Sequence, residues 1–261
     1  MNTVKVSTFS EELMYILPAF RTISLKEMEA VELMSRFDSK YIFHRSLLPS
    51  FLKQLQINYK VLRVDHSLLF RYENLYFDTA DLQSYVEHHN GKSGRFKVRF
   101  RKYVNNNQSF FEVKQKTNKG LTQKSRLNVS DFRKELSSKQ LQFVKEQLHG
   151  KEPHLLPQLS NDFSRITLVN EADHERVTID LLIHFENGAS ERSLDDLIIA
   201  EVKQNHPTSL SVFKKLMMAH RIFPTSISKY CLGTLLTHPG IKYNRFKPKL
   251  TILNKICDVA Y

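Results

Sequence analysis

Basic and apolar residues alternate along two neighbouring segments of this chain, and that alternation restricts how the segments can fold. Residues 95–101 read Arg-Phe-Lys-Val-Arg-Phe-Arg, and residues 111–116 read Phe-Glu-Val-Lys-Gln-Lys. Successive side chains of a β-strand point to opposite faces, so a period of two places all the charges on one face. The pattern therefore predicts two β-strands, each with one apolar and one cationic face.

The charge of the whole protein is concentrated in this region. Between Lys92 and Arg126 there are eleven Lys and Arg residues and a single acid, Glu112, which gives 35 residues a formal charge of +10 out of a total of +12. Cations projected side by side repel one another, and a polyanion that neutralises several at once relieves the repulsion. The composition favours an anionic partner: nucleic acid, a membrane surface or a phosphate-rich small molecule.

Length and composition are those of a soluble globular protein. The chain has 261 residues, of which 41% are hydrophobic and 25% charged, and no window approaches 18 uncharged apolar residues. Glu11 and Glu12 precede the first apolar run, so the N-terminus lacks the layout of a signal peptide. Cys231 and Cys257 have no metal-ligand spacing and form no disulfide framework. We expect a cytoplasmic protein without a transmembrane segment.

Sequence periodicity and turn signals predict a series of strands joined mostly by short turns. The predicted strands cover residues 36–44, 59–64, 69–77, 95–103, 108–117, 121–129, 164–169, 176–185 and 196–204. The predicted helices cover residues 24–34, 46–55, 78–89, 130–149, 210–221 and 229–236. This order favours an α+β fold, an antiparallel eight-stranded β-tunnel that is closed or nearly closed, with helices packed outside.

No linker or repeat divides the chain into independent domains. We expect an N-terminal helical segment that packs on the barrel (1–35), a tunnel domain (36–240) and a loosely held basic C-terminal tail (241–261). Further strands also place ionisable groups two residues apart, at 36–40, 124–126 and 201–203.

A single strand of this kind would most simply face water on its charged side. With several such strands and helices over the apolar side, however, the charged faces would converge on the barrel lumen. A lumen crowded with cations is strongly destabilised when it lacks counter-ions. Such a lumen is suited to binding an oligophosphate, whose negative charges neutralise the cations. The carboxylates among them would hold a divalent metal ion that bridges phosphate oxygens.

Eight short motifs occur along this stretch in a fixed order. They are SKY at 39–41, LYFDT at 75–79, HHNG at 88–91, KVRFR at 97–101, FEVK at 111–114, KSR at 124–126, AEVK at 200–203 and SKYCLG at 228–233. Through them the chain, from Arg36 to Gly233, resembles the catalytic domain of the vacuolar transporter chaperone (VTC) polyphosphate polymerases. The resemblance is to the prokaryotic branch, within the CYTH-like superfamily of triphosphate tunnel metalloenzymes.

The resemblance implies roles for individual residues. Phosphates of nucleotide and product would be held by Lys40, Arg99, Arg101, Lys114, Lys124, Arg165, Arg176 and Lys229, of which Arg99, Arg101, Lys114 and Lys229 are the catalytic candidates. Glu201 would bind the catalytic Mn²⁺ or Mg²⁺. Further candidates are Lys97, Arg126, Lys203 and Ser228 for phosphate, and Glu112 and Asp180 for the metal.

Two positions depart from the pattern that the resemblance sets. The superfamily motif Glu-x-Glu-x-Lys is represented by Arg36, Asp38 and Lys40, so one expected metal ligand is replaced by arginine. This departure favours the polymerase branch over triphosphate hydrolysis. Ser226 stands where a basic residue is expected, which removes one phosphate contact.

Phosphoryl transfer explains why cations, rather than a nucleophile, would dominate such a site. Its transition state is loose, so fixed positive charges such as Lys97, Arg99 and Arg101 stabilise it. His88 and His89 precede an Asn-Gly stop signal, which favours a role in ending a helix over catalysis. The sequence contains neither of the glycine-rich phosphate-binding motifs Gly-x-x-x-x-Gly-Lys and Gly-x-Gly-x-x-Gly.

Three functions follow as hypotheses. The first is a metal-dependent transferase that moves the γ-phosphoryl group of ATP onto polyphosphate. The second is a tunnel triphosphatase that hydrolyses tripolyphosphate or nucleoside triphosphate. The third is a non-catalytic polyanion or nucleic-acid binder, which would expose Phe96 and Phe100 for base stacking, whereas a tunnel would bury them. Synthesis, hydrolysis and sensing of polyphosphate, the preferred metal and acceptor, and the oligomeric state stay open at this point.

Overall fold

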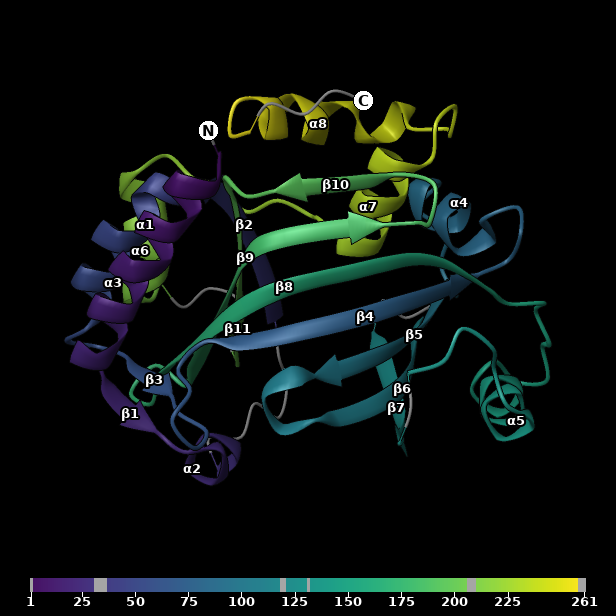
Figure 1. Ribbon diagram of the computed structural model, residues 1–261, viewed down its shortest axis with the longest axis horizontal. Coiled ribbons are helices and arrows are strands. Elements are labelled where there is room, and N and C mark those ends of the chain that lie inside the picture. Colours follow the sequence, from purple (N-terminus) through teal and green to yellow (C-terminus); the bar gives the residue numbers. More distant parts are fainter. Residues whose placement is uncertain (1, 31–36, 118–120, 131, 206–209, 258–261) are drawn as a thin grey trace.

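The computed structural model describes residues 2–30, 37–117, 121–130, 132–205 and 210–257, and Arg36 lies outside them. The helices are α1 (Asn2–Ile16), α2 (Leu25–Ala30), α3 (Leu48–Leu55), α4 (Gln83–His89), α5 (Ser138–Gln147), α6 (Val212–Ala219), α7 (Lys229–Thr237) and α8 (Lys247–Asn254). The strands are β1 (Arg21–Ile23), β2 (Phe37–His44), β3 (Lys60–Leu62), β4 (Phe70–Asp78), β5 (Phe96–Tyr103), β6 (Gln108–Lys116), β7 (Thr122–Val129), β8 (Leu156–Asn170), β9 (Glu175–Glu186), β10 (Glu191–Leu194) and β11 (Leu197–Gln204). Figure 1 shows their arrangement.

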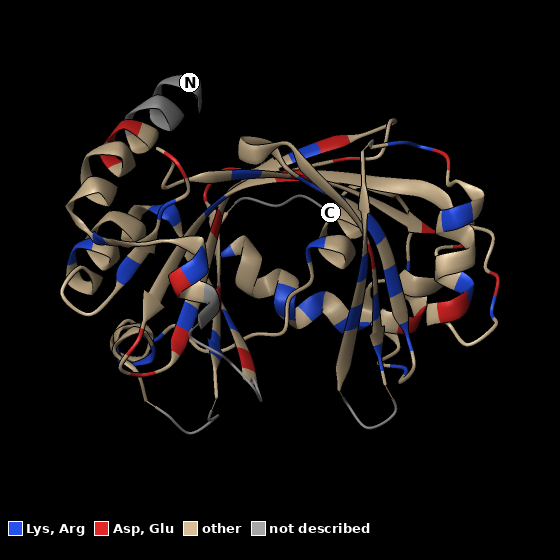
Figure 2. Cartoon of the chain, turned by 90° about the horizontal axis from the view of Figure 1, so that it is seen from below, with Lys and Arg blue, Asp and Glu red and all other residues tan. Residues whose placement is uncertain are grey.

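Eight strands form one antiparallel sheet, as predicted. Their order is β2-β11-β9-β8-β4-β5-β6-β7, while β1, β3 and β10 pair off this path and β1–β3 is the parallel pair. The sheet bends into an arch (Figure 2). Within the described residues no pairing joins β2 to β7, so the arch is open, and the α+β architecture is that of a curved sheet rather than a closed barrel.

Helices cover the outer face of the arch in two places. Helix α3 places Leu48, Phe51, Leu52 and Leu55 on one stripe, and with α1 and α6 it packs against the outer side chains of β2, β8, β9 and β11. Helix α5 and its flanking residues cover β4, β5 and β6. The side chains that alternate with these buried positions point to the other side of the sheet, the inner face.

Helix α7 lies on the inner face, although all helices were expected outside. An added Cβ at Gly233 would stand 2.4 Å from Cδ1 of Phe185 and 2.6 Å from Cδ2 of Leu159, so only glycine permits this close approach of helix and sheet. Together with α4 and α8, helix α7 fills one end of the inner face with apolar side chains.

The prediction of a loosely held C-terminal tail is wrong. Helix α8 buries Leu250 and Leu253 in the inner apolar cluster. The Tyr85 hydroxyl donates to the carbonyl of Lys242 at 2.9 Å, and the Arg245 backbone N–H donates to Nε2 of His89 at 3.1 Å. His89 therefore has a structural contact at the end of α4. No helix in the described part of the chain is long and apolar enough to cross a lipid bilayer.

Candidate functional site

Three lysines stand side by side on the inner face. In the register of β5, β6 and β7, Lys97 lies opposite Lys114, and Lys114 lies opposite Lys124. Like charges directly opposite one another destabilise a sheet. Figure 2 shows basic residues gathered on strands of this limb of the arch, and an anion bound across the lysines would relieve their repulsion.

The phenylalanines that alternate with these cations are buried, as expected for a tunnel. Phe96 is 6% exposed and Phe100 is fully buried, where Phe100 packs against the rings of Phe111 and Phe132 beneath the α5 region. They offer no surface for stacking bases. The observation that would have favoured a single-stranded nucleic-acid binder is therefore not found at Phe96 and Phe100.

Glu112 joins two of the cations. Nε and Nη2 of Arg99 donate to its Oε2 at 2.7 and 2.5 Å, and Nζ of Lys124 makes an ion pair with Oε1. Nη1 of Arg99 also donates to the hydroxyl of Tyr76 at 3.1 Å. Burial raises the pKa of Glu112, but the charges of Arg99, Arg101 and Lys124 outweigh it and hold the pKa well below its usual range. The carboxylate is ionised and fixes Arg99 rigidly.

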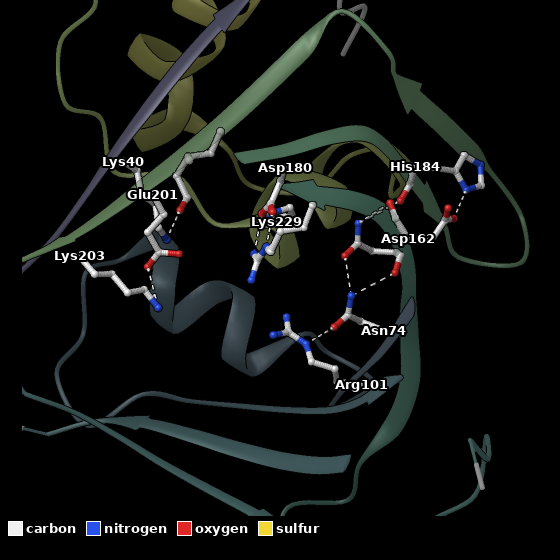
Figure 3. Close-up of polar contacts among 12 residues, drawn as sticks. Lys40, Asn74, Arg101, Asp162, Asp180, His184, Glu201, Lys203 and Lys229 are labelled. Atoms are coloured by element: carbon white, nitrogen blue, oxygen red, sulfur yellow. Dashed lines mark hydrogen bonds and ion pairs between the residues drawn. The ribbon is translucent and has the colours of Figure 1, made fainter. Parts of the chain in front are cut away.

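Asp180 joins another pair of cations in the same way. Nε and Nη2 of Arg165 donate to its two oxygens at 2.5 and 2.8 Å, and Nζ of Lys229, at the start of α7, donates to Oδ2. Nζ of Lys229 also lies 4.3 Å from the ring centroid of Phe163. Burial raises the pKa of Asp180, but Arg165 and Lys229 lower it further than burial raises it. Asp180 thus anchors one end of α7 to the sheet (Figure 3).

The segment before α7 binds two further lysines. Nζ of Lys97 donates to Oγ of Ser228 at 2.7 Å, and Nζ of Lys40 donates to the carbonyl of Ile227 at 3.0 Å. Ser228 is also the N-cap of α7 and accepts from the N–H of Cys231. Burial lowers the pKa of Lys97, and the nearby charge of Lys40 lowers it further.

Glu201 is the carboxylate with the fewest contacts in this group. Its closest described ion-pair partner is Nζ of Lys203 at 3.9 Å, and no described residue hydrogen-bonds its side chain. Burial raises its pKa, but the charges of Lys203, Lys40, Arg165 and Lys114 together lower it to about 2. The carboxylate is ionised and available for a ligand.

Charges from distant strands act on one another across the arch. Four strands separate β6 from β11 in the sheet order, yet Lys114 on β6 and Glu201 on β11 each influence the other's pKa. Lys114 is exposed to solvent, but the surrounding protein removes part of its hydration, and this loss is the largest cause of its lowered pKa. The positive charges of Arg99 and Arg101 lower the pKa of Lys114 further. Glu201, Lys229 and Arg101 lie around one central space (Figure 3).

The remaining predicted residues make contacts of other kinds. Nη2 of Arg176 donates to the carbonyl of Met28 in α2 at 3.0 Å. The guanidinium of Arg126 lies 4.7 Å from the ring centroid of Phe110. On β5, Nε of Arg101 donates to Oδ1 of Asn74 at 2.9 Å.

The carboxylates of the site do not converge on a ready-made metal centre. Among the described residues, no three His, Cys, Asp or Glu side chains are close enough together to hold a metal ion. Glu112 and Asp180 each already bind two cations. The residues present therefore fit a metal ion held by Glu201, with phosphate and water oxygens as the other ligands that Mg²⁺ and Mn²⁺ accept.

The candidate site residues predicted from the sequence did not include the uncharged side chains of the inner face. Tyr72, Asn74 and Tyr76 follow one another at a period of two on β4, and their rings and amide contact Arg165, Arg101 and Arg99. The period-two signal was present in the sequence. It was overlooked because these side chains carry no charge.

The fold and this face define a class of protein in which a curved antiparallel sheet gathers cationic side chains in its hollow (Figure 2). The particular family follows from comparison: the model of the VTC domain matches residues 35–238, and the chain belongs to this family. A search of curated proteins finds no match.

Several solved structures are similar to most of the chain, among them two adenylate cyclase-like proteins. An adenylate cyclase-like protein from Bacillus halodurans is 14% identical, with a TM-score of 0.48, and the match covers 82% of this chain and 99% of that one. An adenylyl cyclase-like protein from Hippeastrum, described as having a dominant triphosphatase activity, is 14% identical, with a TM-score of 0.47, covering 79% of this chain and 98% of that one.

Proposed function

We propose that this protein is a metal-dependent phosphotransferase that moves the γ-phosphoryl group of ATP onto a growing inorganic polyphosphate chain. The observation that carries the proposal is the row Lys97–Lys114–Lys124 across three strands. A linear chain of phosphates presents a negative charge at each unit, and such a chain laid across the row would neutralise all three lysines together. Membership of the VTC family supports this function.

The roles of the side chains follow from their positions. Arg99, Arg101, Lys114 and Lys229 would stabilise charge on the transferred phosphoryl group. The candidates for holding the remaining phosphates are Lys40, Lys97, Lys124, Arg126, Arg165, Arg176, Lys203 and Ser228. Because Glu112 and Asp180 orient Arg99 and Arg165 in advance, these guanidinium groups need little rearrangement when the phosphate arrives.

The reaction needs no nucleophile from the protein. A terminal oxygen of the polyphosphate chain attacks the γ-phosphorus, the bond from that phosphorus to the bridging oxygen breaks, and ADP leaves with the bond electrons. Glu201 would hold Mn²⁺ or Mg²⁺, which when bound supplies charge neutralisation between phosphate oxygens. The lysines and arginines of the inner face would keep donor and acceptor in line.

The products of incubation with ATP and Mn²⁺ test the proposal. We expect long-chain polyphosphate and ADP, detected by gel electrophoresis and chromatography. Orthophosphate without polymer would replace the proposal with a tunnel triphosphatase. Binding of polyphosphate with no turnover would replace it with a polyanion-binding module.

Substitution of Glu201 tests the metal role. Glu201→Gln removes the charge but keeps the shape, so turnover should fall by at least about a hundredfold, because the metal neutralises charge that develops in the transition state. The variant should still fold, although it loses the stabilising contribution of the ionised Glu201. Lys53→Gln, on the exposed side of α3, is the control and should keep full activity. Activity of Glu201→Gln at the level of the unmodified protein would exclude Glu201 from the metal site.

A further inference from the structure

The arginines of the inner face differ in what holds them. Arg99 is ion-paired with Glu112, and Arg165 is ion-paired with Asp180. Arg101 has no carboxylate within ion-pair distance among the described residues; its Nε donates to the amide oxygen of Asn74. Its guanidinium carbon also lies 5.4 Å from the ring centroid of Tyr72.

A second amide fixes the orientation of the first. Nδ2 of Asn74 donates to Oδ1 of Asn161 at 3.2 Å and to its backbone carbonyl at 3.3 Å. Because the NH₂ group of Asn74 is engaged there, its oxygen must face Arg101. Nδ2 of Asn161 in turn donates to the carbonyls of His184, at 3.1 Å, and Asp162, at 3.3 Å. Figure 3 shows this chain of contacts running from Arg101 to β9.

Both amides are shielded from water, so the arrangement is specific. Asn74 is 1% exposed and Asn161 is 2% exposed, and a buried amide without partners costs free energy. The donor and acceptor contacts above satisfy them without introducing a negative charge. Arg101 is only partly buried, so its remaining N–H donors can reach a ligand in the central space.

We infer that Asn74 and Asn161 are positioning residues that aim Arg101 at a phosphate while leaving its positive charge uncompensated. The inference rests on the proposed polyphosphate site and deepens it: unlike Arg99 and Arg165, Arg101 would carry a full net charge to the ligand. Arg99 and Arg165 would serve as donors whose charge is already balanced. Beside the lysines, these three arginines would thus provide one net positive charge and two oriented donors of balanced charge.

Substitution of Asn74 by its charged isostere tests this inference. Asn74→Asp places a carboxylate against Arg101, so affinity for tripolyphosphate, measured by calorimetry without metal, should fall about tenfold or more, which is the scale of losing one charged hydrogen-bond partner. The slope of log Kd against log salt concentration should also decrease by about one, because one fewer charge contact is made with the ligand. Asn58→Asp adds the same charge on the exposed surface after α3 and should change neither quantity.

A double-mutant cycle separates positioning from general damage. In an Arg101→Gln background, Asn74→Asp should cause little further loss of affinity, because Asn74 acts through Arg101. Equal losses with and without Arg101 would overturn the inference. If the unmodified protein binds tripolyphosphate and Asn74→Asp binds it equally well, the inference is overturned. If the unmodified protein does not bind tripolyphosphate at all, the proposed function is overturned as well.

Chemical modification of the unmodified protein gives a readout that needs no variant to fold. Phenylglyoxal should modify Arg101 faster than Arg99 or Arg165, because Arg101 is the one of these three with no carboxylate at ion-pair distance among the described residues. Tripolyphosphate should protect Arg101. Mass spectrometry of the digested protein identifies the modified arginine. Faster modification of Arg99 or Arg165, or no protection of Arg101 by tripolyphosphate, would contradict the inference.

Discussion

At the scale of single residues, Glu112 illustrates how a carboxylate in a cationic field acquires a structural role. It is the one acid among eleven basic residues in its region, and it is 1% exposed. Its charge type made it a metal-ligand candidate from sequence, but the register of β5, β6 and β7 puts it opposite Arg99 and Arg126, where it makes ion pairs with Arg99 and Lys124. Register depends on which strands pair, and a single strand's pattern does not specify that.

Removal of this charge should destabilise the ligand-free protein. Glu112→Gln leaves Arg99 buried beside an uncharged amide, and breaking a buried ion pair from one side costs about 3–5 kcal/mol. Chemical denaturation measures the loss. Tripolyphosphate should restore more stability to this variant than to the unmodified protein, because an anion then replaces the missing charge.

An exposed ion pair provides the matched control for Glu112. Glu152 pairs with Lys145 and its side chain is 64% exposed, so Glu152→Gln should change the free energy of unfolding by less than about 1 kcal/mol. A loss for Glu112→Gln as small as that of the control would show that Glu112 does not hold the cations together.

At the scale of elements, alternation predicted the strands of the cationic limb well because both faces carry a clear signal. The observed β5, β6 and β7 lie within a residue of their predicted ends. The prediction for β8 was too short: the strand runs Leu156–Asn170, and its first half mixes polar residues with apolar ones and leads to a register shift between Asp162 and Ser164. Strand β10 was missed, because four residues carry too little periodicity.

The predicted helix over residues 130–149 contains α5 at Ser138–Gln147. The helix begins where Ser137 and Gln140 form a capping box. The apolar residues before it, Phe132 and Leu136, pack on the same cluster from outside the helix. An apolar spacing predicts which residues are buried more securely than it predicts where a helix begins.

Packing of α7 depends on one glycine, which gives an element-scale prediction. Gly233→Ala would force a methyl group against the buried ring of Phe185, and overpacking of this kind costs about 1–3 kcal/mol. Because α7 carries Ser228 and Lys229, tripolyphosphate affinity should fall together with the thermal unfolding temperature. Lys53→Ala on the exposed side of α3 should alter neither measurement. A variant as stable as the unmodified protein would show that the sheet yields to the added methyl group.

At the scale of the whole molecule, the sequence could not reveal that the arch stays open or that α7 occupies part of its hollow. Both depend on contacts between segments far apart in the chain, such as Gly233 with Phe185 and Leu159. The convergence of charges was nevertheless predicted, because every contributing strand has a period of two. The arch brings Lys114 and Glu201 within electrostatic reach, as a tunnel requires.

The lowered pKa values of three carboxylates predict how stability depends on pH at the acidic end. The pKa values of Glu112, Asp180 and Glu201 are lowered on folding, so their stabilising contribution is present above the unfolded values near about 4. It is lost as the pH falls below that range toward the folded values. Thermal unfolding measured between about pH 5 and pH 2 should show a steep loss of stability.

The lysines act in a higher pH window and link stability to the ligand. The pKa values of Lys97, Lys114 and Lys229 are also lowered, so the unfolded chain binds more protons between these values and about 10.4. Stability without ligand should therefore gain a favourable contribution as the pH rises through that window. A bound polyanion favours the charged lysines, so its stabilising effect should shrink over the same window.

Comparison with a variant isolates this effect from ionisation of the ligand itself. The increase in unfolding temperature caused by tripolyphosphate should decline between about pH 8 and pH 10. In Lys114→Gln the increase should be smaller at pH 8 and the decline shallower, since one titrating contact is absent. Parallel declines in the two proteins would mean that Lys114 does not titrate against the ligand, and the row of three lysines would then lose its central member as a phosphate contact.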